Sequence, residues 1–235
     1  MTNVNEEPPT EAVEATEAVE TVETGAGPAR ITWHPARGTP RLVLTLGHGA
    51  GGGIEARDLK ALATVLPAHD VTVALVEQPW RVAGKKVAPA PKTLDLAWRD
   101  LWPALTEPGL PVISGGRSAG ARVACRTAGE LGARAVLALS FPLHPPGRPE
   151  KSRAGELLGA AVPTLVVQGG NDPFGKPGEF SERGRAYELV EVAHGDHGFA
   201  VPKRAGTTQD EALAVVTDAV VRWVDELGRR PGPLG

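Results

Sequence analysis

The sequence predicts an α/β fold in which a mostly parallel sheet carries helices on both faces. From residue 31 onward, short apolar runs alternate with longer segments whose apolar residues recur at helical spacing, as in parallel strands joined by crossover helices. The run 42–46 is apolar at nearly every position, which is typical of a strand buried on both faces. A Gly-Arg-Ser-Ala-Gly motif at residues 116–120 separates another apolar run from an alanine-rich segment. Glycines around a serine suit a sharp turn from strand to helix.

The expected elements can be placed in chain order. Strands are expected at residues 31–33, at an edge of the sheet, and then at 42–46, 71–76, 111–114, 135–139, 164–167 and 189–192. Helices are expected around residues 59–65, 94–105, 119–131 and 156, and over the last segment up to 227. Pro103 is expected to kink or end the second helix. Thr208 and Glu211 have the spacing of a capping box at the start of the last helix, and Gly228 is expected to end it.

Residues 1–30 differ in composition from the rest of the chain. They hold seven of the 28 acidic residues but one of the 25 basic residues, and their few apolar side chains cannot offset the entropy of ordering the backbone. This segment is predicted to be an acidic disordered tail, which could recruit a weak partner. Residues 31–228 are predicted to form one domain with a sizeable core, and residues 229–235 a flexible C-terminal tail.

Composition also excludes several classes of protein. The single cysteine, Cys125, rules out an internal disulfide framework and is expected to be a small buried residue. Outside the tail the chain is slightly basic, but it has no dense Lys/Arg stripe with interleaved aromatics, so nucleic acid is not an expected partner. Neither a signal peptide nor an uncharged run of the roughly 18 residues that span a bilayer is present. We therefore expect a cytoplasmic protein without a membrane partner.

Ser118 is the candidate nucleophile, because the predicted turn exposes its hydroxyl. Such a hydroxyl needs a neighbouring base, and the base needs a group that orients it. Asp172 follows the expected strand 164–167 and is the candidate orienter; the alternative is an ordinary Asn-Asp-Pro turn. His194 and His197 both follow the strand 189–192, and spacing alone does not choose between them as the base.

The glycine-rich loop 47–53 follows the strand 42–46 and is a second candidate feature. Its glycines leave backbone N–H groups free to face a developing oxyanion, and the N–H after the nucleophile would supply another donor. A phosphate-binding loop is the alternative, but the loop lacks the Lys-Ser/Thr ending of a P-loop and the spacing of a dinucleotide fingerprint. The six histidines lack the close spacing and carboxylate partners of a metal site, so no metal or other cofactor is expected.

Several longer motifs occur together over residues 40–225. They are His48-Gly49-Ala50-Gly51-Gly52, Gln78-Pro79-Trp80-Arg81, Gly116-Arg117-Ser118-Ala119-Gly120, Phe141-Pro142-Leu143-His144-Pro145-Pro146-Gly147, Gln168-Gly169, Asp172-Pro173-Phe174-Gly175 and Asp196-His197. With these motifs the chain resembles the α/β-hydrolase superfamily, and within it the compact dienelactone-hydrolase-like group. That group includes testis-expressed hydrolase-like proteins and the hydrolase-like domain of a subunit of the NSL chromatin complex.

The resemblance implies an α/β-hydrolase fold and a role for each motif. It implies Ser118 as nucleophile, Asp172 as orienter and His197, not His194, as base. It also implies that the backbone N–H groups of Ala50 and Ala119 form the oxyanion hole.

The loop 141–149 and the short segment after it are too small for a large lid, so an open, shallow pocket is expected. The predicted substrate contacts are Trp80, Arg81, Arg117 and His144, and the cations would suit an anionic or polar acyl substrate. The alternatives are solvated surface charge for the arginines and a rigid structural loop for His144.

The sequence therefore predicts a serine hydrolase that cleaves an ester or related acyl bond of a small molecule through an acyl-enzyme. The alternative is a non-catalytic α/β-hydrolase-fold module for protein interaction. Acyl transfer in place of hydrolysis would use the same residues.

Overall fold

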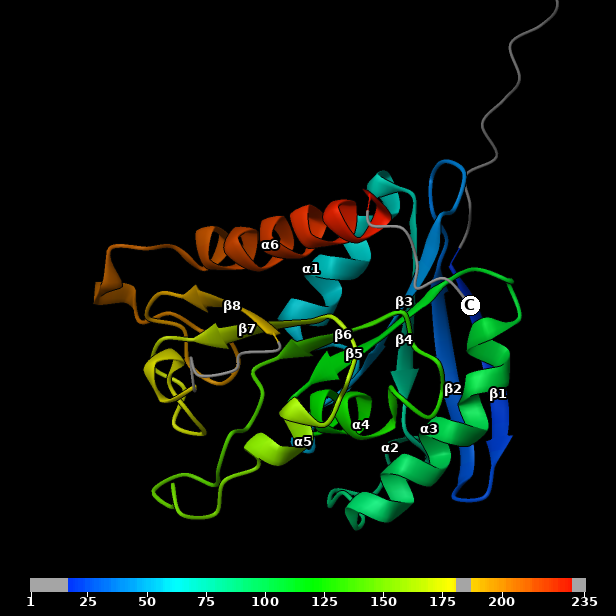
Figure 1. Cartoon of the computed structure of the whole chain (residues 1–235), viewed down its shortest axis with the longest axis horizontal. Coiled ribbons are helices and arrows are strands. Elements are labelled where there is room, and N and C mark those ends of the chain that lie inside the picture. The colour runs from blue at the N-terminus through cyan, green and yellow to red at the C-terminus, as the bar shows by residue number, and fades with distance from the viewer. Residues whose placement is uncertain (1–16, 181–186, 230–235) are drawn as a thin grey trace, which may run out of the picture.

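The computed structural model describes residues 17–180 and 187–229. In this part of the chain, eight strands form one sheet in the order β1-β2-β4-β3-β5-β6-β7-β8 (Figure 1). The strands are β1 (Ala18–Thr24), β2 (Gly27–His34), β3 (Leu42–Gly47), β4 (Val71–Glu77), β5 (Val112–Arg117), β6 (Ala135–Leu139), β7 (Thr164–Gly169) and β8 (Tyr187–Val192). The β1–β2 and β2–β4 pairs are antiparallel, and the other pairs are parallel. The predicted α/β fold with a mostly parallel sheet is confirmed.

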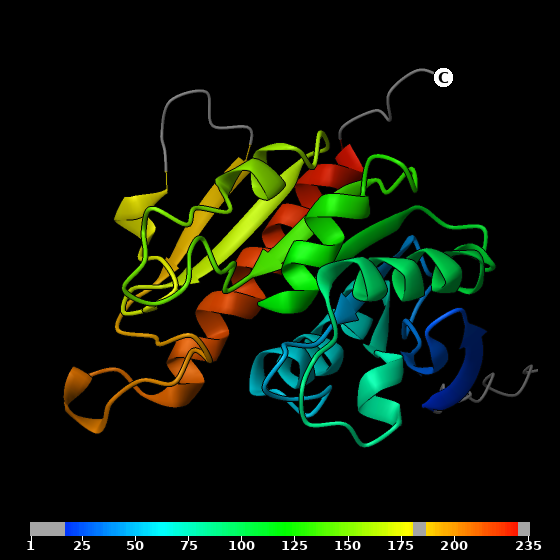
Figure 2. The ribbon, with the colours of Figure 1, turned by 90° about the horizontal axis from the view of Figure 1, so that it is seen from below.

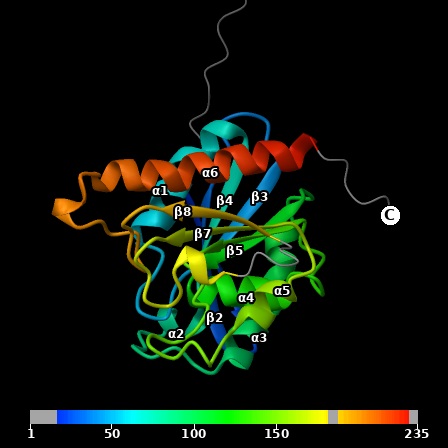
Figure 3. The ribbon, with the colours of Figure 1, turned by 60° about the vertical axis from the view of Figure 1, so that its left-hand side comes forward.

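Helices cover both faces of this sheet, as expected. One face carries α1 (Arg57–Val65) and α6 (Gln209–Arg229), and the other carries α2 (Pro79–Val82), α3 (Pro91–Thr106), α4 (Ala119–Thr127) and α5 (Ala154–Leu158). Figure 3 shows these three layers from the side, and Figure 2 shows α3 and α4 in green in front of the sheet with α6 in red behind it. The 3-10 turns are η1 (Leu66–His69), η2 (Pro177–Glu179) and η3 (Lys203–Ala205).

The side chains of the central strands alternate between two hydrophobic cores. In β3, Val43 belongs to the core under α3 and α4, whereas Leu44 and Leu46 belong to the core under α1 and α6. Successive side chains of a strand point to opposite faces, so a strand between two helical layers must be apolar throughout. This explains the continuous apolar run that the sequence shows at 42–46.

The N-terminal boundary differs from the prediction. Residues 18–24 and 27–34 form the β1–β2 hairpin, so the predicted disordered tail is wrong for residues 18–30, and the strand that contains residues 31–33 lies inside the sheet, not at its edge. The glutamates of β1 are compatible with an edge strand because they are at least partly exposed, and Trp33 Nε1 donates a hydrogen bond to Glu20 at 2.9 Å. Residues 1–16 of the predicted tail lie outside the described residues.

Other element ends shift by a few residues. Pro103 lies inside α3, which continues to Thr106, and α6 passes through Gly228 to end at Arg229. The predicted capping box is confirmed: the Thr208 N–H donates to Glu211 Oε2 at 2.7 Å, and the Glu211 N–H donates to Thr208 Oγ1 at 3.1 Å. Residues 230–235 of the predicted C-terminal tail are not among the described residues. None of the helices described has the length and apolar character needed to cross a membrane.

The six strands β3 to β8 run parallel, so their carboxyl ends open onto one edge of the sheet. The loops that leave this edge contain residues 48–53, 118, 140–149, 170–175 and 193–199. The candidate residues from the sequence therefore converge at one end of the molecule, which is where ligands bind in open α/β sheets.

Candidate active site

Ser118 occupies a strained turn between β5 and α4. Its backbone has φ 52° and ψ −108°, a conformation that non-glycine residues rarely adopt. A Cβ at Gly120 would lie 2.6 Å from the carbonyl carbon of Gly47, and one at Gly116 would lie 2.9 Å from the carbonyl carbon of Gly120. The turn therefore needs glycine on both sides of the serine, because α4 begins against the end of β3.

Ser118, His197 and Asp172 form a continuous chain of hydrogen bonds. His197 Nε2 lies 2.8 Å from Ser118 Oγ, and His197 Nδ1 lies 2.8 Å from Asp172 Oδ2. A carboxylate accepts hydrogen bonds, so the proton of the neutral ring is assigned to Nδ1, and Nε2 accepts from the serine hydroxyl. The structure thus brings together the three residues that the sequence nominated from three separate loops.

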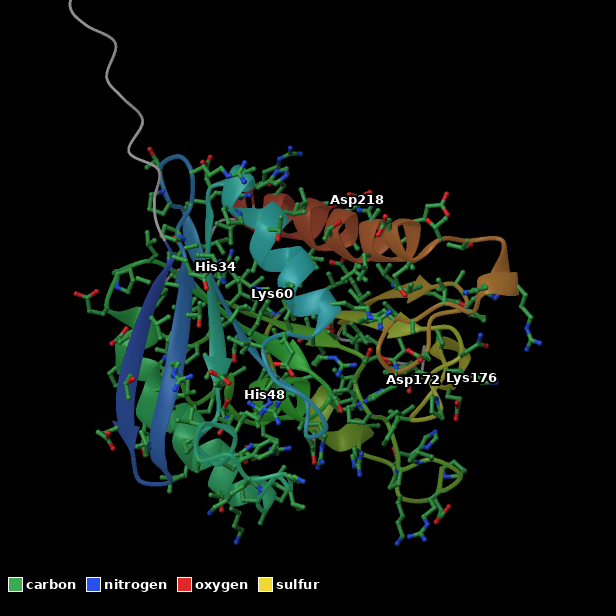
Figure 4. All side chains as sticks on the ribbon, turned by 180° about the vertical axis from the view of Figure 1, so that it is seen from behind. His34, His48, Lys60, Asp172, Lys176 and Asp218 are labelled. Carbon is green, nitrogen blue, oxygen red and sulfur yellow. The ribbon has the colours of Figure 1, made fainter. Side chains whose placement is uncertain are left out.

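The carboxylate of Asp172 is held in place from several sides. It is fully buried, and it accepts hydrogen bonds from Gln168 Nε2 and from the backbone N–H of Phe174, both at 2.8 Å. Gln168 Nε2 also donates to the Gly175 carbonyl at 2.8 Å. Figure 4 labels Asp172 on the loop that follows β7. These bonds fix the carboxylate that faces His197.

The two candidate bases have different surroundings. The His197 ring packs against Phe174, with ring centroids 4.2 Å apart and planes tilted by 30°. His194 is exposed, and its carbonyl accepts a hydrogen bond from Asn171 Nδ2 at 3.2 Å. The geometry therefore places His197, and not His194, against Ser118.

The glycine-rich loop after β3 lies beside the serine. A Cβ at Gly49 would lie 3.4 Å from the Cβ of Ser118, and both Ala50 and Ala119 line the pocket that Ser118 faces. His48 ties this loop to the end of β4, because its Nε2 accepts from the Gln78 N–H at 3.1 Å and its Nδ1 contacts the Gly49 carbonyl at 2.9 Å. Burial lowers the pKa of His48, although the bond to Gly49 opposes this. The neutral ring, donating through Nδ1, fits both contacts.

Arg117 links three parts of the site. Its Nε donates to Asp58 Oδ2 on α1 at 3.1 Å, and its Nη2 donates to the backbone carbonyl of His197. Burial raises the pKa of Asp58, whereas the charge of Arg117 opposes that rise. Arg117 thus connects α1, the nucleophile turn and the loop that carries the candidate base.

Ser118 faces a pocket of about 420 Å³. The pocket is lined by Gly49, Ala50, Gly51, Arg117, Ser118, Ala119, Arg122, Pro142, Arg153, Phe174 and His197. In the part of the chain that the structure describes, no group of three or more His, Cys, Asp or Glu side chains is arranged to hold a metal ion.

Of the four predicted substrate contacts, Arg117 lines this pocket, while Trp80, Arg81 and His144 do not. Trp80 is buried with its ring centroid 5.4 Å from that of His48. Arg81 pairs with Glu55 at 3.3 Å, and His144 Nε2 lies 2.9 Å from Glu179 Oε2. Each of the three is thus engaged with protein groups away from the pocket.

Three lining residues were missed by the sequence reasoning. Arg122 is four residues after Ser118, so helical spacing on α4 would have placed both on one face. Phe174 is two residues after Asp172 in a motif already singled out. Arg153 comes from the irregular segment after β6, and no local pattern marks it.

The comparisons with known proteins agree with this architecture. Residues 40–225 match the model of a family described as an alpha/beta hydrolase domain. No curated protein matches the sequence.

Solved structures are similar in fold at low sequence identity. An α/β serine hydrolase without lid from Xanthomonas campestris is 16% identical, with a TM-score of 0.69 over 96% of this chain and 100% of that one. A dienelactone hydrolase from Anabaena variabilis is 20% identical, with a TM-score of 0.70 over 91% and 99% of the two chains. Est1E from Butyrivibrio proteoclasticus is 15% identical, with a TM-score of 0.67 over 90% and 99%. The predicted fold without a large lid is therefore confirmed.

Proposed function

Since this chain belongs to the alpha/beta hydrolase family, we propose that it is a serine hydrolase that cleaves an ester or related acyl bond of a small molecule. The observation that carries the proposal is the chain of hydrogen bonds from Ser118 through His197 to Asp172, with distances of 2.8 Å at both links. This chain opens onto a pocket flanked by the glycine-rich loop. A protein that only binds a partner has no chemical need for such an arrangement.

In the first half of the reaction, Ser118 Oγ attacks the carbonyl carbon while His197 Nε2 takes the hydroxyl proton. The carbonyl oxygen becomes an oxyanion, and the backbone N–H groups of Ala50 and Ala119 donate hydrogen bonds to it. When the bond to the leaving group breaks, His197 returns the proton to the leaving oxygen. The product of this half is an acyl-enzyme on Ser118.

In the second half, water takes the place of the leaving group. The oxygen of the water attacks the acyl carbon while His197 Nε2 accepts a proton from that water. His197 then donates this proton to Ser118 Oγ as the acid leaves. Asp172 stays ionised throughout and stabilises the imidazolium that forms in each half. The hydrogen bonds that hold Asp172 keep the ring in the orientation that both halves require.

Within the family, the motifs support a relation to the compact dienelactone-hydrolase-like group, including its testis-expressed and NSL-complex members. The motif Phe141 to Gly147 contributes most to this assignment, because the lone Gly-x-Ser-x-Gly pattern is common to many hydrolases. The proposed partner is a small acyl substrate.

Hydrolysis of a panel of short acyl esters tests this function. We expect turnover by the wild type and loss of turnover in Ser118→Ala. Thr39→Ala is the control, because it removes an exposed hydroxyl that does not line the pocket, and we expect it to keep the wild-type rate. Equal turnover by wild type and Ser118→Ala would contradict the proposal. Products that carry the acyl group on an added alcohol would instead indicate acyl transfer.

A further inference from the structure

The wall of the pocket next to Ser118 is rich in arginine. Arg117, Arg122 and Arg153 all line it, and none of the lining residues is a carboxylate. Charges in such a wall matter for binding only when their own protein partners do not already neutralise them. The ion pairs of the three side chains therefore decide which of them can take a ligand.

Two of the three guanidinium groups have a carboxylate partner. Arg117 pairs with the buried Asp58 at 3.1 Å. Arg122 pairs with Glu156 through two parallel hydrogen bonds of 2.8 and 2.6 Å, which is the strongest geometry for this pair. Glu156 also accepts a hydrogen bond from Arg126 at 2.9 Å, so its two oxygens are already shared between two arginines.

Arg153 differs from both. Its Nη1 donates to the backbone carbonyl of Pro142 at 3.2 Å, and it forms no ion pair with a carboxylate of residues 17–180 or 187–229. Burial and the neighbouring charge of Arg122 lower the pKa of Arg153, whereas the charge of Glu156, which forms its ion pairs with Arg122 and Arg126, opposes this. A guanidinium in proteins nevertheless remains charged. Within the described residues, the wall therefore carries one guanidinium without a carboxylate partner, and the side-chain hydrogen bond of that guanidinium is the one from Nη1 to Pro142.

The backbone fixes where this charge sits. The Arg153 N–H donates to the Leu143 carbonyl at 2.7 Å, which ties the residue to the loop after β6. Pro142, whose carbonyl accepts from the side chain, lines the same pocket as Ser118 and His197. The guanidinium is thus held beside the space that a bound ester would fill, before any ligand arrives.

We infer that Arg153 binds a carboxylate of the substrate, so that the proposed hydrolase acts on short esters that carry a negative charge close to the scissile bond. The inference rests on the proposed function. A single unpaired guanidinium matches a monoanion, and its planar fork suits a carboxylate. A pocket of about 420 Å³ has room for a short acyl group next to Ser118.

Two pairs of esters test this inference. Phenyl hemiglutarate against phenyl valerate places the charge on the acyl side, and 3-carboxyphenyl butyrate against phenyl butyrate places it on the leaving group. For each pair, the ratio of kcat/KM for the charged ester to that for the neutral ester is measured. In the wild type we expect this ratio to favour the charged ester in at least one pair.

Arg153→Gln should lower that ratio by about 10- to 100-fold, which is the usual effect of removing a hydrogen bond between charged groups. Arg153→Lys keeps the positive charge but loses the planar guanidinium that can donate two parallel hydrogen bonds to a carboxylate, so an intermediate ratio is expected. Arg148→Gln removes an exposed arginine of the same loop that does not line the pocket. This matched control should leave the ratio at its wild-type value.

The outcomes separate this inference from the proposed function. Turnover of the neutral esters with no preference for either charged ester, or a preference that survives in Arg153→Gln, would overturn the inference while the hydrolase proposal stands. A fall of the ratio in Arg148→Gln as large as in Arg153→Gln would also overturn it. Absence of turnover of all four esters, together with absence of labelling by a fluorophosphonate, would overturn both.

Discussion

Replacing Arg117 with glutamine removes the group that links α1, the nucleophile turn and the His197 loop. Asp58, the carboxylate partner of Arg117, is fully buried, and its Oδ2 accepts a hydrogen bond from Arg117 Nε at 3.1 Å. Removing one partner of a buried ion pair leaves the other charge unpaired, which costs about 3–5 kcal/mol. We expect Arg117→Gln to lose stability on this scale at pH 8.

The loss should depend on pH. Burial already raises the pKa of Asp58, and Arg117 is the main charge that opposes this, so its removal raises that pKa further. A carboxyl group with a raised folded-state pKa contributes most stability below its unfolded pKa of about 3.9, and that contribution is lost as pH rises through the folded value. The free energy of unfolding of Arg117→Gln should therefore approach that of the wild type as pH falls from 8 to 5.

Urea denaturation of both proteins at pH 5 and pH 8 measures this effect. In the double variant Asp58→Asn with Arg117→Gln, neither charge of this pair remains, so the pH-dependent part of the loss should disappear. Its kcat/KM should still be about 10- to 100-fold below wild type, because the His197 carbonyl has lost its donor and the base is less well positioned. Equal stability of Arg117→Gln and wild type at both pH values would refute the reasoning.

Two further predictions compare matched pairs of variants. His197→Asn should lower kcat by about 100- to 10,000-fold because it removes the proposed base, whereas His194→Asn should keep the wild-type rate; asparagine suits position 194, where φ is 59°. The reverse result in an ester assay would assign the base to His194. Gly120→Ala should lose about 1–3 kcal/mol of unfolding free energy, because its Cβ would lie 2.6 Å from a β3 carbonyl carbon. Gly52→Ala, where a Cβ meets no atom within 4 Å, should change stability little, and equal urea midpoints for the two would contradict the steric argument.

The parts of the fold and site that could be predicted from the sequence depend on local patterns. A strand covered on both faces is apolar at nearly every position, so residues 42–46 could be placed without tertiary information. Parallel strands all end at one edge of the sheet, so the order of Ser118, Asp172 and a histidine after the last strand was enough to expect that such side chains meet, and the family resemblance pointed to His197 as that histidine.

The parts that could not be predicted depend on partners far away in the chain. The edge strand β1 carries two exposed glutamates, Glu20 and Glu23, and it is ordered by pairing with β2. Arg81 and His144, which the sequence placed in the pocket, do not line it and pair with Glu55 and Glu179, which are distant in the chain. Spacing left His194 and His197 equal, whereas the geometry separates them. Arg153 reaches the pocket through an irregular segment, which no periodicity describes.

The central claim is that Ser118 is the nucleophile activated by His197. A fluorophosphonate probe, followed by mass spectrometry of the digested protein, tests it most directly, because the probe forms a stable adduct only with an activated serine. We predict a single adduct on the peptide that contains Ser118, and none in Ser118→Ala. Well-folded wild type that remains unlabelled, or an adduct on another serine, would contradict the account.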